Sequence, residues 1–148
     1  MAVLHEGVTI RHPQVSFSLP DCTARGTLYV VRFNAILKKV PAVFYATPRG
    51  NEPVRQWLKK LDDDSRRIVG VDIATAEFGW PTGMPLCRDM GKRLFEIRSN
   101  ITDGRIARVL FAVVDEEMVL LHGFIKKTQR TPVRELNLAL KRLKEYEQ

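Results

Sequence analysis

Residues 105–125 read Arg105-Ile-Ala-Arg-Val-Leu-Phe-Ala-Val-Val114, then Asp115-Glu-Glu117, then Met118-Val-Leu-Leu-His-Gly-Phe-Ile125. Two strand-length apolar runs separated by a short polar break predict two neighbouring antiparallel strands. The first run is apolar at every position from Val109 to Val114, which is typical of a central strand covered on both faces. A third run, Lys92-Arg-Leu-Phe-Glu-Ile-Arg98, precedes them across a turn sequence. The sequence therefore predicts three adjacent antiparallel strands.

The segment before these strands predicts one more strand and a pair of helices. Pro41-Ala-Val-Phe-Tyr45 has strand length, and Pro53 can occupy the first turn of a helix. That helix has an apolar stripe at i, i+3, i+4 and i+7, formed by Val54, Trp57, Leu58 and Leu61. A second helix is expected from Asp62-Asp-Asp-Ser65, which offers N-cap and first-turn carboxylates, to about residue 78. Gly70 lies inside the second helix and predicts a close crossing of the two helices there.

The C-terminal segment predicts a last helix. Thr131 is the expected N-cap and is followed by Pro132. The buried stripe of this helix is expected to be Val133, Leu136, Leu140 and Leu143. The predicted fold class is therefore α+β, with a helical hairpin packed on a small antiparallel sheet and a C-terminal helix.

Composition and charge indicate the class of partner. The 148-residue chain has a net charge of +7, from 24 basic and 17 acidic residues. Residues 1–37 are irregular and carry three basic and two acidic residues, so we interpret them as an N-terminal extension of unknown role. The charge excess belongs to the predicted domain, residues 38–148, and favours a polyanionic partner such as RNA. No apolar run is long enough to span a membrane, and Cys22 and Cys87 stand alone, so a cytoplasmic protein is expected.

Basic residues are concentrated in the strand region. Between residues 88 and 134 they are Arg88, Lys92, Arg93, Arg98, Arg105, Arg108, Lys126, Lys127, Arg130 and Arg134. Because Glu96 and Arg98 share one face of their strand and Arg108 lies on the neighbouring strand, these cations can converge on one sheet face and bind phosphates. The residues expected to bind RNA are Lys92, Arg93, Arg105, Thr128 and Arg130. Solvated cations that protect strand edges are the alternative reading for any one of them.

Three motifs carry a resemblance to a known family. They are Leu94-Phe-Glu-Ile-Arg98, Arg108-Val-Leu-Phe111 and Leu120-Leu-His-Gly-Phe-Ile-Lys-Lys-Thr-Gln-Arg-Thr-Pro132. In order and spacing they resemble the phage-derived HigB-like toxins of the RelE/ParE superfamily. The resemblance also includes the strand at 43–45, the helix start at Pro53 and the terminal helix, and so covers about three quarters of the chain. The extension before Lys38 has no counterpart in this pattern.

The resemblance implies the toxin of a type II toxin–antitoxin system. Such a toxin is a ribosome-dependent endoribonuclease, an mRNA interferase that needs no cofactor, and a HigA-like helix-turn-helix antitoxin encoded beside it restrains it. In metal-free RNA cleavage the ribose 2′-hydroxyl attacks the adjacent phosphate, which requires a base, an acid and cations. Lysines crowded by other cations have lowered pKa values, so the candidate base is Lys126 or Lys127. Arg98 and Arg108 are expected to face solvent and to stabilise the phosphorane, while the other lysine or Arg130 positions RNA.

Two further residues have alternative roles. His122 is either a half-buried histidine below the site or the general acid. Its strand parity groups it with Leu120, Phe124 and Lys126. Glu96 is expected to orient Arg98 or Arg108, because a carboxylate among cations is a weak proton acceptor. Trp57 could stack on a base, but its place on the apolar stripe favours the core.

Two other functions remain open from the sequence. A ParE-like toxin of the same superfamily would inhibit DNA gyrase and cleave nothing. A noncatalytic RNA-binding accessory protein would need only the basic sheet. No His, Cys and carboxylate cluster has ligand spacing, so no metal site is expected.

Overall fold

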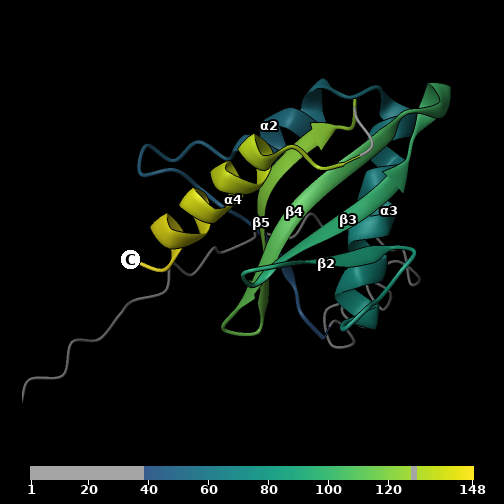
Figure 1. Cartoon of the computed structure of the whole chain (residues 1–148). Helices are drawn as coiled ribbons and strands as arrows, with labels where there is room; N and C mark the ends of the chain where they lie inside the picture. The colour runs from purple at the N-terminus through teal and green to yellow at the C-terminus, as the bar shows by residue number, and fades with distance from the viewer. Residues whose placement is uncertain (1–38, 128–129) are drawn as a thin grey trace, which may run out of the picture.

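Five strands form one open sheet in the order β1-β5-β4-β3-β2 (Figure 1). The computed structural model describes residues 39–127 and 130–148, so the predicted extension, residues 1–37, lies outside the described residues. The strands are β1 (Ala42–Phe44), β2 (Cys87–Gly91), β3 (Leu94–Asn100), β4 (Ile106–Val114) and β5 (Glu117–Ile125). β4 pairs antiparallel with both β3 and β5, which confirms the three predicted central strands. The α+β class is also confirmed.

The sheet is mixed, and the prediction of an antiparallel sheet is wrong at one edge. β1 pairs parallel with β5, with Ala42 opposite Met118. The buried residue Glu77, on the helix that packs on the sheet, fixes the position of the chain where β1 begins. Its carboxylate accepts from the Ala42 N–H at 2.6 Å. Its backbone carbonyl also accepts from the Lys39 N–H at 3.0 Å. A three-residue strand carries no sequence signal for its direction, which is set by the elements that connect it to its partner.

The strand β2 forms the other edge, and the sequence did not predict it. It pairs with β3 through a tight turn in which Lys92 and Arg93 have φ values of 53° and 65°. This left-handed conformation matches the twist of a two-residue hairpin. Arg88 and Asp89 on β2 are exposed, and charged side chains on an edge strand discourage pairing with other chains. Because these charged residues are adjacent, the β2 sequence lacks the apolar–polar alternation by which a strand is recognised.

The predicted helical hairpin, α2 (Pro53–Lys60) and α3 (Asp63–Gly79), covers one face of the sheet. Asp62 caps α3 as expected, because its carboxylate accepts from the Ser65 N–H at 2.8 Å. The predicted close crossing at Gly70 is wrong, since Gly70 is exposed and a Cβ there would contact nothing within 4 Å. The strands and helices of this face enclose an apolar core that includes Val69, Ile97, Val109, Phe111 and Leu120.

The predicted C-terminal helix, α4 (Val133–Tyr146), lies across β4 and β5 on the opposite face (Figure 1). Its N-cap is Pro132, not Thr131, and no side chain caps it. The Thr131 hydroxyl binds residues of the sheet instead, as described below. A second core beneath α4 includes Leu94, Leu110, Ala112, Leu121 and Ala139.

A β-bulge in β5 changes which side chains reach the α4 face. Leu110 pairs with His122, but the next residue, Phe111, pairs with Leu120, so Leu121 is an extra residue in β5. The predicted grouping of His122 with Leu120 is therefore wrong. Leu120 packs in the core beneath α2 and α3, whereas His122 contacts α4. The bulge also directs Gly123 toward α2, where it meets Trp57.

Candidate functional site

Glu96 and Arg108 form a buried ion pair beneath the start of α4. Arg108 Nη1 donates to Glu96 Oε1, and the side chains of Arg108 and Glu96 are only 3% and 0% exposed, respectively. Thr131 completes the network, because its Oγ1 donates to Glu96 Oε2 at 2.6 Å and accepts from Arg108 Nη1 at 2.8 Å. The attraction within a buried pair barely offsets the cost of desolvating both charges. The network therefore serves mainly to fix the segment that enters α4 on the sheet.

This burial corrects one expectation. Arg108 was expected to face solvent, but α4 and Thr131 cover it and it is 2% exposed. The orienting role expected of Glu96 has a definite partner in the structure, since its carboxylate binds Arg108. Arg108 thus lies beneath the surface on which a ligand would rest.

Arg98 lies directly opposite Arg108 in the register of β3 and β4, and it is half-buried. Like charges directly opposite each other destabilise a sheet. The Nε atoms of both arginines are buried, and neither has a hydrogen-bond partner among residues 39–127 and 130–148. Buried donors without partners are uncommon in folded proteins. Of these two partners, Arg98 is half-buried and Arg108 is buried, so Arg98 is the one whose guanidinium an anion can contact.

Lys126 lies near this arginine pair. Its backbone N–H donates to the Ile106 carbonyl at 2.7 Å, and its side chain is half-buried. Phe124 is the strand partner of Arg108. Because side chains alternate along an extended chain, Lys126 continues the face occupied by Phe124 and Arg108. The predicted residues Arg98, Arg108 and Lys126 are therefore brought together.

Lys127 lines a cleft of about 460 Å³ beside this cluster. The cleft lies between α2 and the start of α4, and its walls include Trp57, Gly123, Phe124, Arg134 and Glu135. Lys127 is exposed, whereas Lys126 is half-buried. The two adjacent lysines therefore have different environments. Thr128, which was expected to bind RNA, lies outside the described residues.

His122 belongs to a polar chain beneath α4. Its Nδ1 lies 3.2 Å from Arg142 Nη1, which also donates to the Leu121 carbonyl at 2.8 Å. A guanidinium can only donate, so Nδ1 accepts, and Nε2 carries the proton that it donates to Glu135 Oε2 at 2.5 Å. Burial lowers the pKa of His122, and the hydrogen bond to Glu135 opposes this effect only in part. His122 is therefore a neutral, half-buried residue that links β5 to α4.

A comparison with protein families agrees with the motifs. Residues 56–144 match the family model described as phage-derived protein Gp49-like, which is more than half of the chain. The chain belongs to the Gp49-like family. This family is associated with RelE- and HigB-type toxins. No curated protein matches the chain.

In this Gp49-like protein, Lys92, Arg93 and Arg105, which were also predicted to bind RNA, lie apart from the arginine pair. Lys92 and Arg93 occupy the β2–β3 turn, where Arg93 binds Glu147 after the end of α4. Arg105 binds Asp62 at 3.1 Å, at the start of α3. The hydrogen bond from the Ser65 backbone, assisted by Arg105, lowers the pKa of Asp62 to about 2. Arg130 is exposed and precedes Thr131.

Three residues of the Gp49-like site were not identified from the sequence. By composition Thr131 fits a helix cap, and Glu135 and Arg142 belong to none of the three motifs. Glu135 and Arg142 are seven residues apart, so they share a helix face beside the predicted buried stripe. This seven-residue spacing is the feature of the sequence that could have indicated their contact with the sheet.

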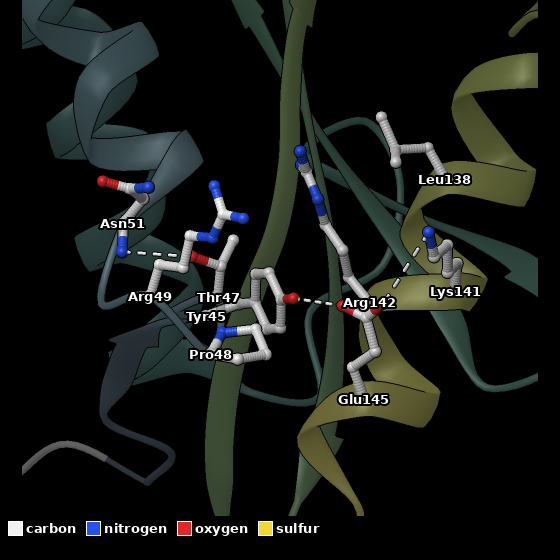
Figure 2. A pocket seen from close by; sticks show the side chains of 9 residues that line it. All are labelled: Tyr45, Thr47, Pro48, Arg49, Asn51, Leu138, Lys141, Arg142 and Glu145. Atoms are coloured by element: carbon white, nitrogen blue, oxygen red, sulfur yellow. Dashed lines mark hydrogen bonds and ion pairs between the residues drawn. The ribbon is translucent and has the colours of Figure 1, made fainter.

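A second hollow of about 410 Å³ lies between the loop after β1 and α4 (Figure 2). Figure 2 shows Tyr45 and Lys141 both directed at Glu145, which accepts from the Tyr45 hydroxyl and lies 3.8 Å from Lys141 Nζ. Arg142 also lines this hollow, but its Nη1 binds Leu121 and His122. Lys141 and Glu145 thus pair with each other, and Arg142 is engaged by the sheet. The arginine pair is the stronger candidate for a ligand site.

Two further properties concern the part of the chain that the structure describes, residues 39–127 and 130–148. No group of three or more His, Cys, Asp and Glu side chains in these residues is arranged to hold a metal ion. No helix among them has the length and apolar character required to cross a membrane.

Proposed function

We propose that this Gp49-like protein is the toxin of a type II toxin–antitoxin pair, a ribosome-dependent endoribonuclease that cleaves translated mRNA without a metal. The observation that supports this proposal is the Arg98–Arg108 pair, whose buried Nε donors have no partner among the described residues. The phosphate of an RNA backbone has the charge and the acceptor oxygens that a guanidinium binds, and half-buried Arg98 is the member of the pair that such a phosphate can contact. The association of the family with RelE- and HigB-type toxins supports the same class of activity.

The positions of the side chains suggest a division of roles. Arg98, the half-buried member of the arginine pair, contacts the scissile phosphate and stabilises the charge that develops on it. Arg108 is a positioning residue, because Glu96 and Thr131 hold it beneath the surface. Lys126 takes the proton of the 2′-hydroxyl. The 2′-oxygen then attacks phosphorus, and the bond to the 5′-oxygen breaks to leave a cyclic phosphate and a 5′-oxygen that takes a proton from water to become a 5′-hydroxyl.

Lys127 and Arg130, which are both exposed, bind the RNA backbone beside this centre. His122 is assigned to structure, since its ring nitrogens are engaged by Arg142 and Glu135 beneath α4. The proposed partner is a helix-turn-helix antitoxin encoded beside the toxin. Co-expression of the neighbouring gene should restore growth to cells that the protein arrests.

The test is Arg98→Met, which keeps the aliphatic stem of the side chain and removes the guanidinium. Cleavage of a translated message, mapped by primer extension with and without ribosomes, should fall roughly a hundredfold or more. The free energy of unfolding should not decrease, because the variant removes a like-charge contact with Arg108. Arg67→Met is the matched control, since Arg67 lies on α3 with its side chain 77% exposed.

Three outcomes would contradict the proposal. Undiminished cleavage by Arg98→Met would remove this residue from the mechanism. Growth arrest with intact messages and trapped gyrase would indicate a gyrase inhibitor. Message binding by the wild-type protein without any cleavage would indicate a noncatalytic RNA-binding protein.

A further inference from the structure

The cleft beside the arginine pair exists because β5 is covered by β1 along only part of its length. β1 pairs with residues Met118–Leu120 of β5, and the chain then leaves the sheet toward α2. Gly123, Phe124 and Ile125 of β5 consequently line the cleft between α2 and the start of α4. The cleft of about 460 Å³ is larger than a single side chain would fill.

Trp57 is held against the strand at the bottom of this cleft. A Cβ built on Gly123 would lie 2.3 Å from Trp57 Cε3 and 2.6 Å from Cζ3, so only glycine allows the ring to approach this closely. Trp57 nevertheless remains partly exposed and lines the cleft. The predicted core role of Trp57 thus describes only the part of the ring that packs on the strand.

The surroundings of Trp57 combine aromatic and cationic groups. Phe124 also lines the cleft, and its ring stacks on His122 with centroids 5.6 Å apart. Lys127 and Arg134 lie at the rim, and the Arg134 side chain is 89% exposed. Glu135, the acidic residue among the lining side chains, is bound by His122 and Arg134. Stacking surfaces together with cations are the means by which proteins bind single-stranded nucleic acids.

The cleft adjoins the proposed phosphate site. Phe124 is the strand partner of Arg108, and Lys127 follows Lys126 in the chain. Neighbouring strands lie about 4.8 Å apart, which is less than the separation of consecutive nucleotides in an extended strand. An RNA whose phosphate reached the arginine pair would therefore place a neighbouring base at the cleft.

We propose that the cleft binds one unpaired RNA base, stacked on Trp57, with Lys127 and Arg134 holding the flanking phosphates. This inference rests on the proposed function, because it names the part of the RNA substrate that the same site binds. The base next to the scissile bond is thereby held by stacking, and Arg98 contacts the adjacent phosphate.

The experiment measures binding separately from cleavage. Full-length protein is titrated with a 2′-O-methyl RNA hexanucleotide, which cannot be cut, and with the same oligonucleotide carrying one abasic position. The base-bearing oligonucleotide should quench Trp57 fluorescence, identified as the signal lost in Trp57→Leu. Loss of the stacking contact should weaken binding roughly 5- to 150-fold. The contact is lost either when the oligonucleotide lacks the base or when Trp57→Leu removes the ring. Tyr146→Leu, which removes an exposed aromatic ring at the far end of α4, should bind like the wild type.

A second variant keeps the test valid if Trp57→Leu disturbs the fold. Arg134→Gln alters a side chain that is almost fully exposed, so it should not affect folding. It should weaken binding of both oligonucleotides equally and make the dependence of affinity on salt shallower.

The outcomes separate this inference from the proposed function. Equal binding of the two oligonucleotides, or saturation of the cleft by an acidic peptide but not by RNA, would overturn the inference while cleavage by the wild type persisted. Conversely, base-dependent quenching of Trp57 in a protein that cleaves no message would support the inference and contradict the proposed nuclease.

Discussion

The two faces of the sheet are covered in different ways. On the face beneath α2 and α3, Ile97, Val109, Phe111 and Leu120 are buried among apolar neighbours. On the face beneath α4, the charged residues Glu96 and Arg108 are buried within a similar apolar layer. Burying apolar area stabilises a fold, whereas burying an ion pair contributes little or reduces stability. Both apolar layers therefore supply stability, but the second face also contains an ion pair that holds charged groups in fixed positions and adds little stability.

Replacing Arg108 should produce the largest effect. Arg108→Ala leaves the Glu96 carboxylate buried without a charged partner, so the free energy of unfolding should fall by about 3–5 kcal/mol. On the opposite face, Ile97→Val should cost only about 0.5–1.5 kcal/mol. Urea denaturation monitored by circular dichroism measures both values.

A double replacement distinguishes a lost pair from a lost packing contact. Arg108→Met combined with Glu96→Leu removes both charges and keeps most of the volume, so it should recover most of the stability lost in Arg108→Ala. If Arg108→Ala cost less than Ile97→Val, the two faces would not differ as described.

The second effect concerns pH. Because burial lowers the pKa of His122 in the folded state, the unfolded chain binds a proton more readily. The stabilising contribution of neutral His122 is complete above the ordinary pKa of about 6.5 and is lost as the pH falls below it. The slope should not exceed about 1.4 kcal/mol per pH unit for one group. The measurement is the free energy of unfolding between pH 7.5 and 5, compared between the wild type and His122→Gln.

The titration of Glu135 does not affect the measurement between pH 7.5 and 5. Its pKa is lowered below 4.5, because its hydrogen bonds with His122 and Arg134 outweigh the opposing effect of burial. Its contribution is therefore lost only at more acidic pH. A His122→Gln variant with the same slope as the wild type would show that His122 titrates normally in the fold.

The smallest effect is expected on α3 and has the opposite sign. Gly70→Ala adds a methyl group that meets nothing within 4 Å, and it removes a residue that disfavours helices. The free energy of unfolding should increase by up to about 1 kcal/mol. Gly79→Ala is the control, since its Cβ would lie 2.9 Å from Thr82 Oγ1 and should give no such gain. A loss of stability in Gly70→Ala would indicate a neighbour at this position.

The sequence predicted the elements of the first face better than the details of the second. Apolar patterns located α2 and the three central strands, because they reflect the burial that stabilises these elements, and capping residues located the start of α3. Periodicity cannot reveal a β-bulge, so the extra residue Leu121 led to the wrong grouping of His122 with Leu120. Thr131 fits an N-cap by composition, but the buried carboxylate of Glu96, distant in the sequence, binds its hydroxyl.

The arginine pair was only partly predictable. Strand alternation placed Arg98 and Arg108 on one face, and the structure makes them direct partners. Their exposure could not be predicted, because it depends on where α4 crosses the sheet. Trp57 shows the same limit, since its place on an apolar stripe does not indicate that a cleft opens beside it.

The parallel pairing of β1 with β5 constrains the order in which the chain can fold. Ala42 and Met118 are partners across 76 residues of sequence, whereas Val114 and Glu117 are partners across a tight turn. Contacts between distant residues carry a larger loop-closure entropy and tend to form later. During synthesis, β1 therefore has no strand partner until β5 has been made, and Thr131 follows later still. We expect the β3-β4-β5 meander to assemble first, and the charged network beneath α4 to close only after Thr131 has been made.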